Sequence, residues 1–300
     1  MTMLIAGFGD LGRQIALQRI RESQSEGSDA SAPHPAIYAL SRSAQQQEMP
    51  VGVQAIAADL TDPASLTVIP RGITELVYCA SADASDPSSY QAIYVQGLRH
   101  VLTQVLSEQG DQSGADSPQL RVVFVSSTAV YARSMAGWVD EQTPTEPDRF
   151  NGTIMLQAEA LCRQLVPQAQ ILRLSGIYGP GRTYLLRRLL TGSATIPADH
   201  DYWANRIHIE DAARAVLHLL RLVKQGDTFI GSDSHPTPLA QVYKDLARRI
   251  GAPEPQVGPP NAMMGKKRLS NRKLIESGFA FRWPDAREGY QTVIDEFLST

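Results

Sequence analysis

The 300-residue sequence predicts an α/β fold built on a doubly wound parallel sheet. Short apolar runs recur along its first part, and each is continuously apolar rather than alternating, as in strands that are buried on both faces. The segments between several of these runs have the length and apolar periodicity of helices, so right-handed strand–helix–strand crossovers are the expected connections. The predicted strands are 3–6, 36–40, 54–58, 75–80, 120–125 and 169–174.

Helical periodicity continues through the C-terminal part, where the strand pattern becomes less regular after Leu174. This change divides the chain into a larger sheet domain, expected at 1–174 and 205–231, and a smaller, partly helical domain, expected at 175–204 and 232–300. Two polar segments, 23–35 and 109–118, are predicted to be loops. The predicted helices are 11–20, 87–108, 152–166, 211–223, 238–250 and 285–298.

Composition excludes several classes of protein. The formal net charge is −3 and 43% of the residues are hydrophobic, which is ordinary for a soluble globular chain. This mild acidity argues against a nucleic-acid partner or a membrane surface, because both require a positive field. No apolar run reaches the roughly 20 residues of a membrane span. Cys79 and Cys162 are too few and too far apart for a disulfide framework or a metal site, so we expect reduced thiols and a cytoplasmic location.

A glycine-rich turn follows the first predicted strand and opens the first predicted helix. Its residues match the dinucleotide-binding pattern G-x-G-x-x-G, in which the glycines allow a tight turn, close approach to a pyrophosphate and helix packing. The free N–H groups at the start of the helix then meet the phosphates. The larger domain is therefore predicted to be of the Rossmann type, with the smaller domain on the substrate side. The residues of the turn are Gly7, Phe8, Gly9, Asp10, Leu11 and Gly12.

The end of the second predicted strand bears on the choice between NAD and NADP. An NAD site usually places a carboxylate there, but this chain has Ser41 and Arg42 and no acid. A guanidinium can pair with a 2′-phosphate in a forked geometry, so we favour NADP, with NAD as the alternative if Arg42 is only a solvated loop residue.

A series of motifs in one order resembles the extended branch of the short-chain dehydrogenase/reductase superfamily, the NAD-dependent epimerase/dehydratase family. The resemblance covers almost the whole chain. Its parts are the glycine turn and the segments 59–62, 125–131, 139–144, 158–159, 173–181 and 206–211.

The resemblance implies a role for each matching position. Asp59 and Leu60 would contact adenine, and Ala80 and Ser81 would pass the cofactor's ribose. Ser127 would orient the substrate oxygen. The other cofactor positions would be Ser126, Ser175, Gly176 and Ile177, and the substrate-side positions would be Thr128, Asn151 and Arg206. The family often forms dimers, which implies a homodimer by analogy.

The chain departs from the family at the proton-transfer pair, a tyrosine four residues before a lysine whose charge lowers the tyrosine pKa. Those positions here are Asn151 and Met155. No Tyr-x-x-x-Lys occurs anywhere, and none of the five lysines precedes Lys224. Tyr94 stands where the family often has an asparagine.

The sequence is compatible with two functions. The first, which we favour, is an NADP-dependent oxidoreductase, epimerase or dehydratase that acts on a small carbonyl or sugar-nucleotide-like molecule with a relocated acid or base. Tyr131, Tyr178 and His208 are the candidate proton donors, although His208 could equally be a packed core residue. The second is a dinucleotide-responsive regulatory or partner-binding protein without turnover.

Overall fold

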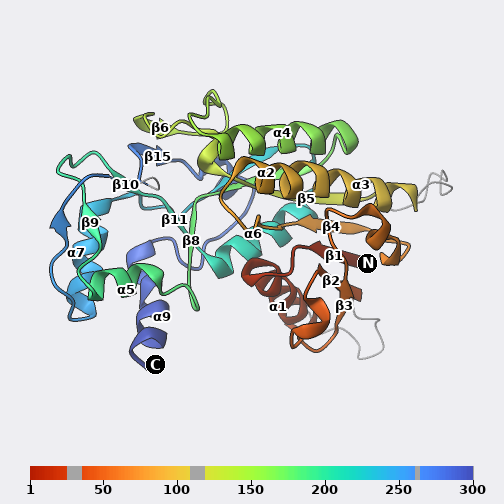
Figure 1. The fold of residues 1–300 in the computed structure, drawn as a ribbon, viewed down its shortest axis with the longest axis horizontal. Coiled ribbons are helices and arrows are strands. Elements are labelled where there is room, and N and C mark those ends of the chain that lie inside the picture. The colour runs from red at the N-terminus through yellow and green to blue at the C-terminus, as the bar shows by residue number, and fades with distance from the viewer. Residues whose placement is uncertain (26–35, 109–118, 261–263, 300) are drawn as a thin grey trace. The chain divides into compact units, whose positions relative to one another are not determined.

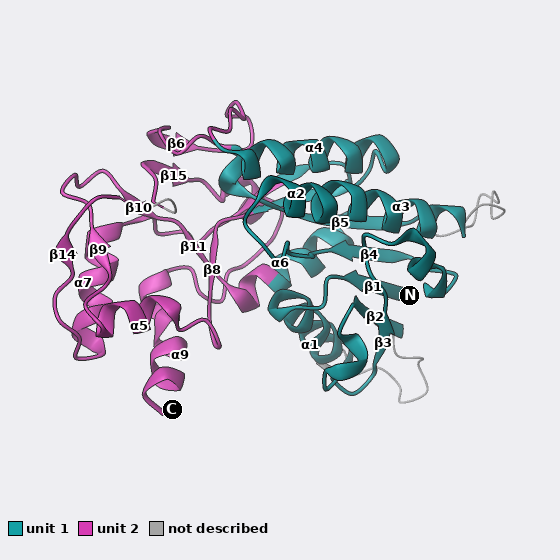
Figure 2. Ribbon diagram, viewed as in Figure 1, with its two compact units in different colours: residues 1–130, 149–173, 213–228 teal, residues 131–148, 174–212, 229–300 magenta. Residues whose placement is uncertain are grey.

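The computed structural model describes residues 1–25, 36–108, 119–260 and 264–299 (Figure 1). Most of both predicted polar loops therefore lies outside the described residues. The chain forms two compact units, coloured separately in Figure 2. Unit 1 comprises residues 1–130, 149–173 and 213–228, and unit 2 comprises residues 131–148, 174–212 and 229–300.

A central parallel sheet confirms the predicted fold class. Within the described residues, seven strands form it in the order β12-β7-β5-β4-β1-β2-β3. The pairs β1–β2, β1–β4, β2–β3 and β4–β5 are parallel. The strands are β1 (Thr2–Ala6), β2 (Ala36–Ser41), β3 (Val53–Ala57), β4 (Glu75–Tyr78), β5 (Arg121–Ser127), β7 (Gln170–Leu174) and β12 (Thr228–Gly231).

Helices flank this sheet because its strands are apolar on both sides. Every residue of β4 and β7 is buried, as the continuous apolar runs predict. Figure 1 shows α3 (Leu98–Ser107) and α4 (Phe150–Leu165) side by side, with α1 (Asp10–Ser25) across the sheet from them. The other helical segments are α2 (Pro87–Tyr90), α6 (Ile209–Arg221) and the short turns η1 (Ala44–Gln46), η2 (Pro63–Val68) and η4 (Thr128–Val130).

The predicted helix 87–108 contains an irregular middle. Between α2 and α3 the chain forms a π-helical turn, η3 (Gln91–Gly97). Such turns are rare and occur frequently at functional sites. This one carries Tyr94, one of the two departures from the family pattern.

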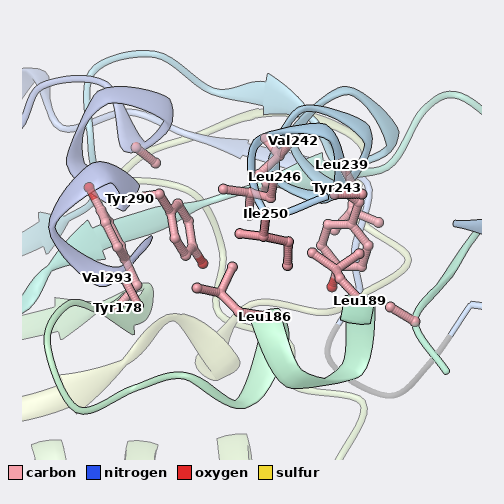
Figure 3. Close-up of a cluster of buried hydrophobic side chains, with 14 of the residues drawn as sticks. Tyr178, Leu186, Leu189, Leu239, Val242, Tyr243, Leu246, Ile250, Tyr290 and Val293 are labelled. Atoms are coloured by element: carbon pink, nitrogen blue, oxygen red, sulfur yellow. The ribbon is translucent and has the colours of Figure 1, made fainter. Parts of the chain in front are cut away.

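Unit 2 is held by short strand pairs and a helical core. The pairs are β10–β13, β8–β11, β9–β14 and β6–β15. The core cluster in Figure 3 includes Leu186, Leu246 and Val293, from α5, α7 and α9 respectively. The elements are β6 (Gly137–Val139), β8 (Gly176–Tyr178), α5 (Tyr184–Leu190), β9 (Thr195–Ile196), β10 (Trp203–Ala204), β11 (Arg206–His208), β13 (Thr237–Pro238), α7 (Leu239–Arg249), β14 (Gln256–Val257), β15 (Lys267–Leu269), α8 (Arg272–Glu276) and α9 (Ala286–Ser299).

Two longer segments fall in unit 2 although the sequence-based division assigned them to the larger domain, and Leu174 and residues 229–231 do so as well. Residues 131–148 join it because β6 pairs with β15, and residues 205–212 join it because β11 pairs with β8. Periodicity cannot reveal either pairing, because both join very short strands that are distant in sequence. No helix in the described ranges is long and apolar enough to cross a membrane.

Candidate functional site

Two of the three glycines in the predicted phosphate-binding turn are required by the packing of unit 1. Gly7 has a φ of +99°, and a Cβ there would lie 2.3 Å from the Cα of Ala80, which follows β4. A Cβ on Gly12 would lie 2.5 Å from the carbonyl oxygen of Gly7. Any side chain at either position would therefore force the turn away from the sheet.

The third glycine, Gly9, faces open space. A Cβ on Gly9 would meet no atom within 4 Å, so the protein's own packing does not explain why this residue lacks a side chain. Gly9 directly precedes α1, whose first N–H groups and positive dipole end favour an anion. Phe8 and Leu11 bury their side chains and so anchor the turn. The arrangement fits a pyrophosphate that approaches the backbone at Gly9.

Acidic and basic side chains gather at the carboxyl ends of β2, β3 and β4. Arg42 donates from Nη2 to both carboxylate oxygens of Asp83, at 2.8 and 2.6 Å. Both side chains are more than half exposed. Asp59 accepts from the backbone N–H and the hydroxyl of Thr61, each at 2.8 Å, and the first of these bonds is the main reason for its lowered pKa. Arg42 also acts on Asp59 electrostatically.

The remaining predicted residues near these strand ends differ in exposure. Leu60 is 7% exposed, and its carbonyl oxygen contacts His100 Nδ1 at 3.1 Å. Ser41 has a buried hydroxyl for which the described part of the chain offers no hydrogen-bond partner. Ser81 is exposed, directly after Ala80.

The three residues at the end of β5 have different surroundings. The Ser126 hydroxyl donates to Glu159 Oε1 at 2.6 Å, and Glu159 forms a buried ion pair with Arg173 at 2.6 Å. Ser126 is thus tied into the core of unit 1. Ser127 is half-buried, and its Oγ accepts from the backbone N–H of Ala129 at 3.2 Å, which leaves its own proton available to a substrate oxygen. Thr128 is also half-buried.

The first two turns of α4 carry the replacements for the family's tyrosine and lysine. Asn151 has a buried side-chain oxygen without a hydrogen-bond partner among the described residues. Met155 is 3% exposed and packs in the core. An amide can orient a ligand but cannot relay a proton, and a thioether can do neither, so α4 does not supply the usual acid and base.

Tyr94 is a site residue that sequence reasoning did not propose. Its hydroxyl interacts with the Ser81 side chain and the Ala82 backbone, and burial raises its pKa. Its ring lies 5.0 Å from that of Tyr90, which in turn lies 5.3 Å from Phe150 at the start of α4. The signal that could have identified it is its departure from the family's asparagine. The π turn therefore brings a protonated phenol to the residue predicted to pass the cofactor's ribose.

In unit 2, the ladder between β8 and β11 brings predicted residues together in register. Gly176 lies opposite Arg206, and Tyr178 lies opposite His208. A Cβ on Gly176 would lie 2.7 Å from Arg206 Nη1, so the glycine makes room for the guanidinium. Ile177 pairs with Ile207 in the same ladder. Ser175, just before it, has a buried hydroxyl without a partner in the described ranges.

All three predicted proton donors of unit 2 are buried. Tyr131 is 0% exposed and donates its hydroxyl proton to the carbonyl oxygen of Asp140 at 2.8 Å. Tyr178 is 2% exposed, and burial raises its pKa. His208 is 1% exposed, and burial lowers its pKa. These environments favour a packing role for all three side chains over proton transfer.

The hydrogen bonds of His208 support its packing role. Its Nδ1 accepts from the backbone N–H of Glu210 at 3.2 Å, and its Nε2 contacts Thr292 Oγ1 at 3.2 Å. Its ring centroid lies 5.2 Å from that of Tyr178 and 5.1 Å from that of Trp283. Both ring nitrogens are thus engaged within unit 2.

One of the five lysines is buried, and its ammonium group donates hydrogen bonds to backbone carbonyl oxygens. Lys267 is 8% exposed and donates from Nζ to the carbonyl oxygen of Tyr131 at 2.8 Å. Burial lowers its pKa to about 8. It therefore fixes residues 131–132 of unit 2 rather than lowering the pKa of a tyrosine. In the described ranges, no group of three or more His, Cys, Asp or Glu side chains could hold a metal ion.

Comparisons with known proteins agree with this geometry. The model of the NAD-dependent epimerase/dehydratase family matches residues 25–231. The solved structure of a candidate NAD-dependent epimerase/dehydratase from Methylobacillus flagellatus is 35% identical, covers 99% of this chain and 98% of its own, and has a TM-score of 0.76. A search of curated proteins gave no match.

Two more distant structures share the fold. UDP-glucose 4-epimerase from Thermotoga maritima is 17% identical, with a TM-score of 0.78, and the match covers 100% of this chain and 99% of that one. A dTDP-glucose 4,6-dehydratase from Streptomyces venezuelae is 18% identical, with a TM-score of 0.80, and the match covers 100% of this chain and 98% of that one. The family match over more than half of the chain and the 35% identical structure show that the protein belongs to the NAD-dependent epimerase/dehydratase family.

Proposed function

We propose that the protein binds NADP(H) at the glycine turn of unit 1 and catalyses redox chemistry on a small carbonyl or sugar-nucleotide-like substrate. The observation that carries this proposal is the open space at Gly9, in front of the first turn of α1. Three of the proteins with similar structures were solved with NAD: the Streptomyces venezuelae dehydratase, a Thermus thermophilus UDP-glucose 4-epimerase and the protein MoeE5.

Different residues of unit 1 contact different parts of the cofactor and the substrate. The backbone at Gly9 and the first N–H groups of α1 bind the pyrophosphate. Asp59 faces the adenosine half, and Ser81 with Tyr94 faces the ribose. When bound, a nicotinamide dinucleotide supplies the group that accepts or donates hydride. Ser127 donates a hydrogen bond to the substrate oxygen and so fixes its orientation.

The choice of NADP rests on Arg42. Its ion pair with Asp83 is exposed, and such pairs are worth at most about 1 kcal/mol. A dianionic 2′-phosphate, which accepts a forked pair of hydrogen bonds, can therefore replace Asp83 at the guanidinium. Asp83 remains close by and repels the phosphate, so the expected preference for NADP over NAD is modest.

The proton donor of the proposed reaction is Tyr94. Its raised pKa keeps the phenol protonated, which suits a group that donates a proton or hydrogen bond to a developing alkoxide. No lysine precedes residue 224, so no ammonium on the α4 helix stabilises the phenolate afterwards. The predicted reaction is therefore slow for this family.

A second function, a dinucleotide-responsive protein without turnover, is favoured by one set of observations. Asn151 and Met155 replace the acid–base pair, and Tyr131, Tyr178 and His208 are all buried. Both functions require dinucleotide binding, so binding and turnover must be measured separately.

The deciding experiment is a titration with NADPH and NADH, followed by fluorescence of the reduced nicotinamide. A screen of aldehydes, ketones and sugar nucleotides then follows, and turnover is read both as oxidation of the better-binding cofactor and as conversion of the substrate, because an epimerase or dehydratase leaves no net change in the cofactor. Binding with turnover supports the enzyme, and a Tyr94→Phe variant should then lose most of its rate. Binding without turnover across the screen supports the regulatory protein. If neither dinucleotide binds, both functions are wrong.

A further inference from the structure

A buried hydroxyl from the central sheet reaches into the irregular helical turn that carries Tyr94. Tyr78 is the last residue of β4 and is 0% exposed. Its hydroxyl donates to the carbonyl oxygen of Ile93 at 2.5 Å. Ile93 lies in the π turn η3, directly before Tyr94. Insertion of a side chain into the backbone ladder is one of the few causes that distort a helix. The hydrogen bond therefore ties the end of β4 to the irregular part of the helix.

Gly97, the last residue of η3, makes room for this hydroxyl. Its φ of −59° is ordinary for a helix, so the backbone conformation does not require a glycine. A Cβ there, however, would lie 2.8 Å from the hydroxyl oxygen of Tyr78. Glycine weakens a helix, because it loses more conformational freedom on folding than any other residue. The space that the Tyr78 hydroxyl occupies explains why a glycine nevertheless stands at this position.

The chain that follows β4 holds the same turn at a second point. The hydroxyl of Tyr94 interacts with the Ser81 side chain and the Ala82 backbone. The residues just after Tyr78 therefore contact the phenol, while Tyr78 itself holds the carbonyl group of the residue before it. All of these residues belong to unit 1. Two attachments at adjacent residues of the turn fix the direction of a side chain more closely than one.

The ring and the hydroxyl of Tyr78 make separate contributions. The ring packs in the core of unit 1, with its centroid 6.0 Å from that of Phe124. Burial raises the pKa of Tyr78 well above its usual range, so the hydroxyl stays protonated and remains a donor to Ile93. A phenylalanine in this place would keep the packing of the ring and lose only the donor.

We propose that Tyr78 is a positioning residue for Tyr94. Its hydroxyl holds η3 in the π conformation, and this conformation directs the phenol of Tyr94 toward Ser81. The inference rests on the proposed function, in which Tyr94 is the proton donor, and it adds the residue that keeps this donor in place. Because Tyr78 is fully buried, it cannot touch the cofactor or the substrate and acts on the reaction only through Tyr94.

The test follows the phenol of Tyr94 directly, by NMR of the full-length protein labelled with ¹³C at the Cζ atom of tyrosine. Tyr94→Phe assigns the resonance by its loss, and Ser81→Ala gives its position once the serine contact is removed. Tyr78→Phe should move the resonance toward that position. A resonance that stays in place in folded Tyr78→Phe would overturn the proposal.

Phe124→Leu is the control for damage to the core. It removes buried packing beside the Tyr78 ring and leaves the hydroxyl intact. Thermal unfolding should show a lower midpoint, whereas the Tyr94 resonance should keep its wild-type position. A shift as large as that of Tyr78→Phe would assign the effect to packing and contradict a role for the hydroxyl.

Gly97→Ala separates the hydrogen bond from the filling of space. Combined with Tyr78→Phe, its methyl group enters the volume that the hydroxyl leaves, where the next nearest atom is the Cβ of Leu60 at 3.1 Å. The double variant should regain part of the thermal stability lost in Tyr78→Phe, but its Tyr94 resonance should remain shifted. If refilling the space returned the resonance to its wild-type position, the proposal would be wrong.

Kinetics tests the same residue through the proposed reaction. With a substrate that the wild type converts, Tyr78→Phe should lower kcat at least about tenfold, because a displacement of about 1 Å at a reacting group can cost this much. In the Tyr94→Phe protein, the same change should lower kcat no further, because the donor that Tyr78 positions is already gone. A further tenfold loss there would show that Tyr78 acts apart from Tyr94.

The two readouts distinguish failure of this inference from failure of the proposed function. If the wild type converts no substrate, the proposed enzyme activity is wrong, while the resonance of Tyr94 still decides whether Tyr78 positions it. If the wild type is active and Tyr78→Phe keeps its full kcat, the role of Tyr78 is wrong and the proposed function stands.

Discussion

Replacement of Gly9 by alanine separates an effect on ligand binding from an effect on stability. The added Cβ meets no protein atom within 4 Å, and the backbone of Gly9 is not in the left-handed region. The free energy of unfolding should therefore stay the same or rise by up to about 1 kcal/mol, because alanine restricts the unfolded chain. In the proposed complex, however, the methyl group occupies the space that the pyrophosphate requires.

The expected loss of NADPH affinity is large. A methyl group cannot be moved aside, so the phosphate must retreat from the N–H groups of α1. We expect the Kd for NADPH to rise at least about tenfold, which corresponds to roughly 1.4 kcal/mol. Nicotinamide fluorescence measures the Kd, and chemical denaturation measures the stability.

Gly7→Ala is the contrasting variant. Its Cβ would lie 2.3 Å from the Ala80 backbone, and its φ of +99° is strained for any residue with a side chain. We expect it to lose more than about 2 kcal/mol of stability whether or not a ligand is present.

Gly265→Ala in unit 2 is the matched control, because its Cβ would make only an ordinary contact at 3.6 Å with the Arg133 carbonyl oxygen. It should change neither quantity. A folded Gly9→Ala protein that binds NADPH as tightly as the wild type would refute the assignment of the glycine turn as the phosphate site.

Three further predictions concern other residues. Asp83→Asn removes the competing carboxylate from Arg42 and should tighten NADPH binding by about 1 kcal/mol or less without affecting NADH; weaker NADPH binding would contradict the NADP assignment. Ser127→Ala should lower kcat/KM about ten- to a hundredfold without a change in stability, which steady-state kinetics measures. Ser126→Ala should instead lower the free energy of unfolding by about 1–3 kcal/mol, because it loses the hydrogen bond to Glu159, and denaturation measures this loss. Burial raises the pKa of Asp233 to about 8, so the folded protein keeps a proton that the unfolded chain releases above about pH 4. The free energy of unfolding therefore falls as the pH rises from about 4 to 8. Asp233→Asn should match the wild type in stability at pH 4 and exceed it by about 2 kcal/mol or more at pH 8, and equal stability at pH 8 would show that the carboxyl is not protonated.

Local pattern was sufficient for much of unit 1. Continuous apolar runs predicted its strands and the parallel sheet because burial on both faces leaves no room for polar alternation. The motif G-x-G-x-x-G predicted where the backbone turns because its three glycines stand within six consecutive residues. The sequence has no lysine before residue 224, so it shows by itself that α4 carries no ammonium group to lower the pKa of a tyrosine.

Tertiary structure decided the state of individual side chains, because burial and hydrogen bonding depend on residues distant in sequence. Tyr131, Tyr178 and His208 look alike in the sequence as proton donors, yet contacts with residues such as Asp140, Gly289 and Thr292 bury all three. The π turn that brings Tyr94 to Ser81 and the β6–β15 pairing that places Arg268 opposite Trp138 leave no periodic trace. Sequence alone thus determined the scaffold and what is missing from it, and only the fold decided which side chains are available to act.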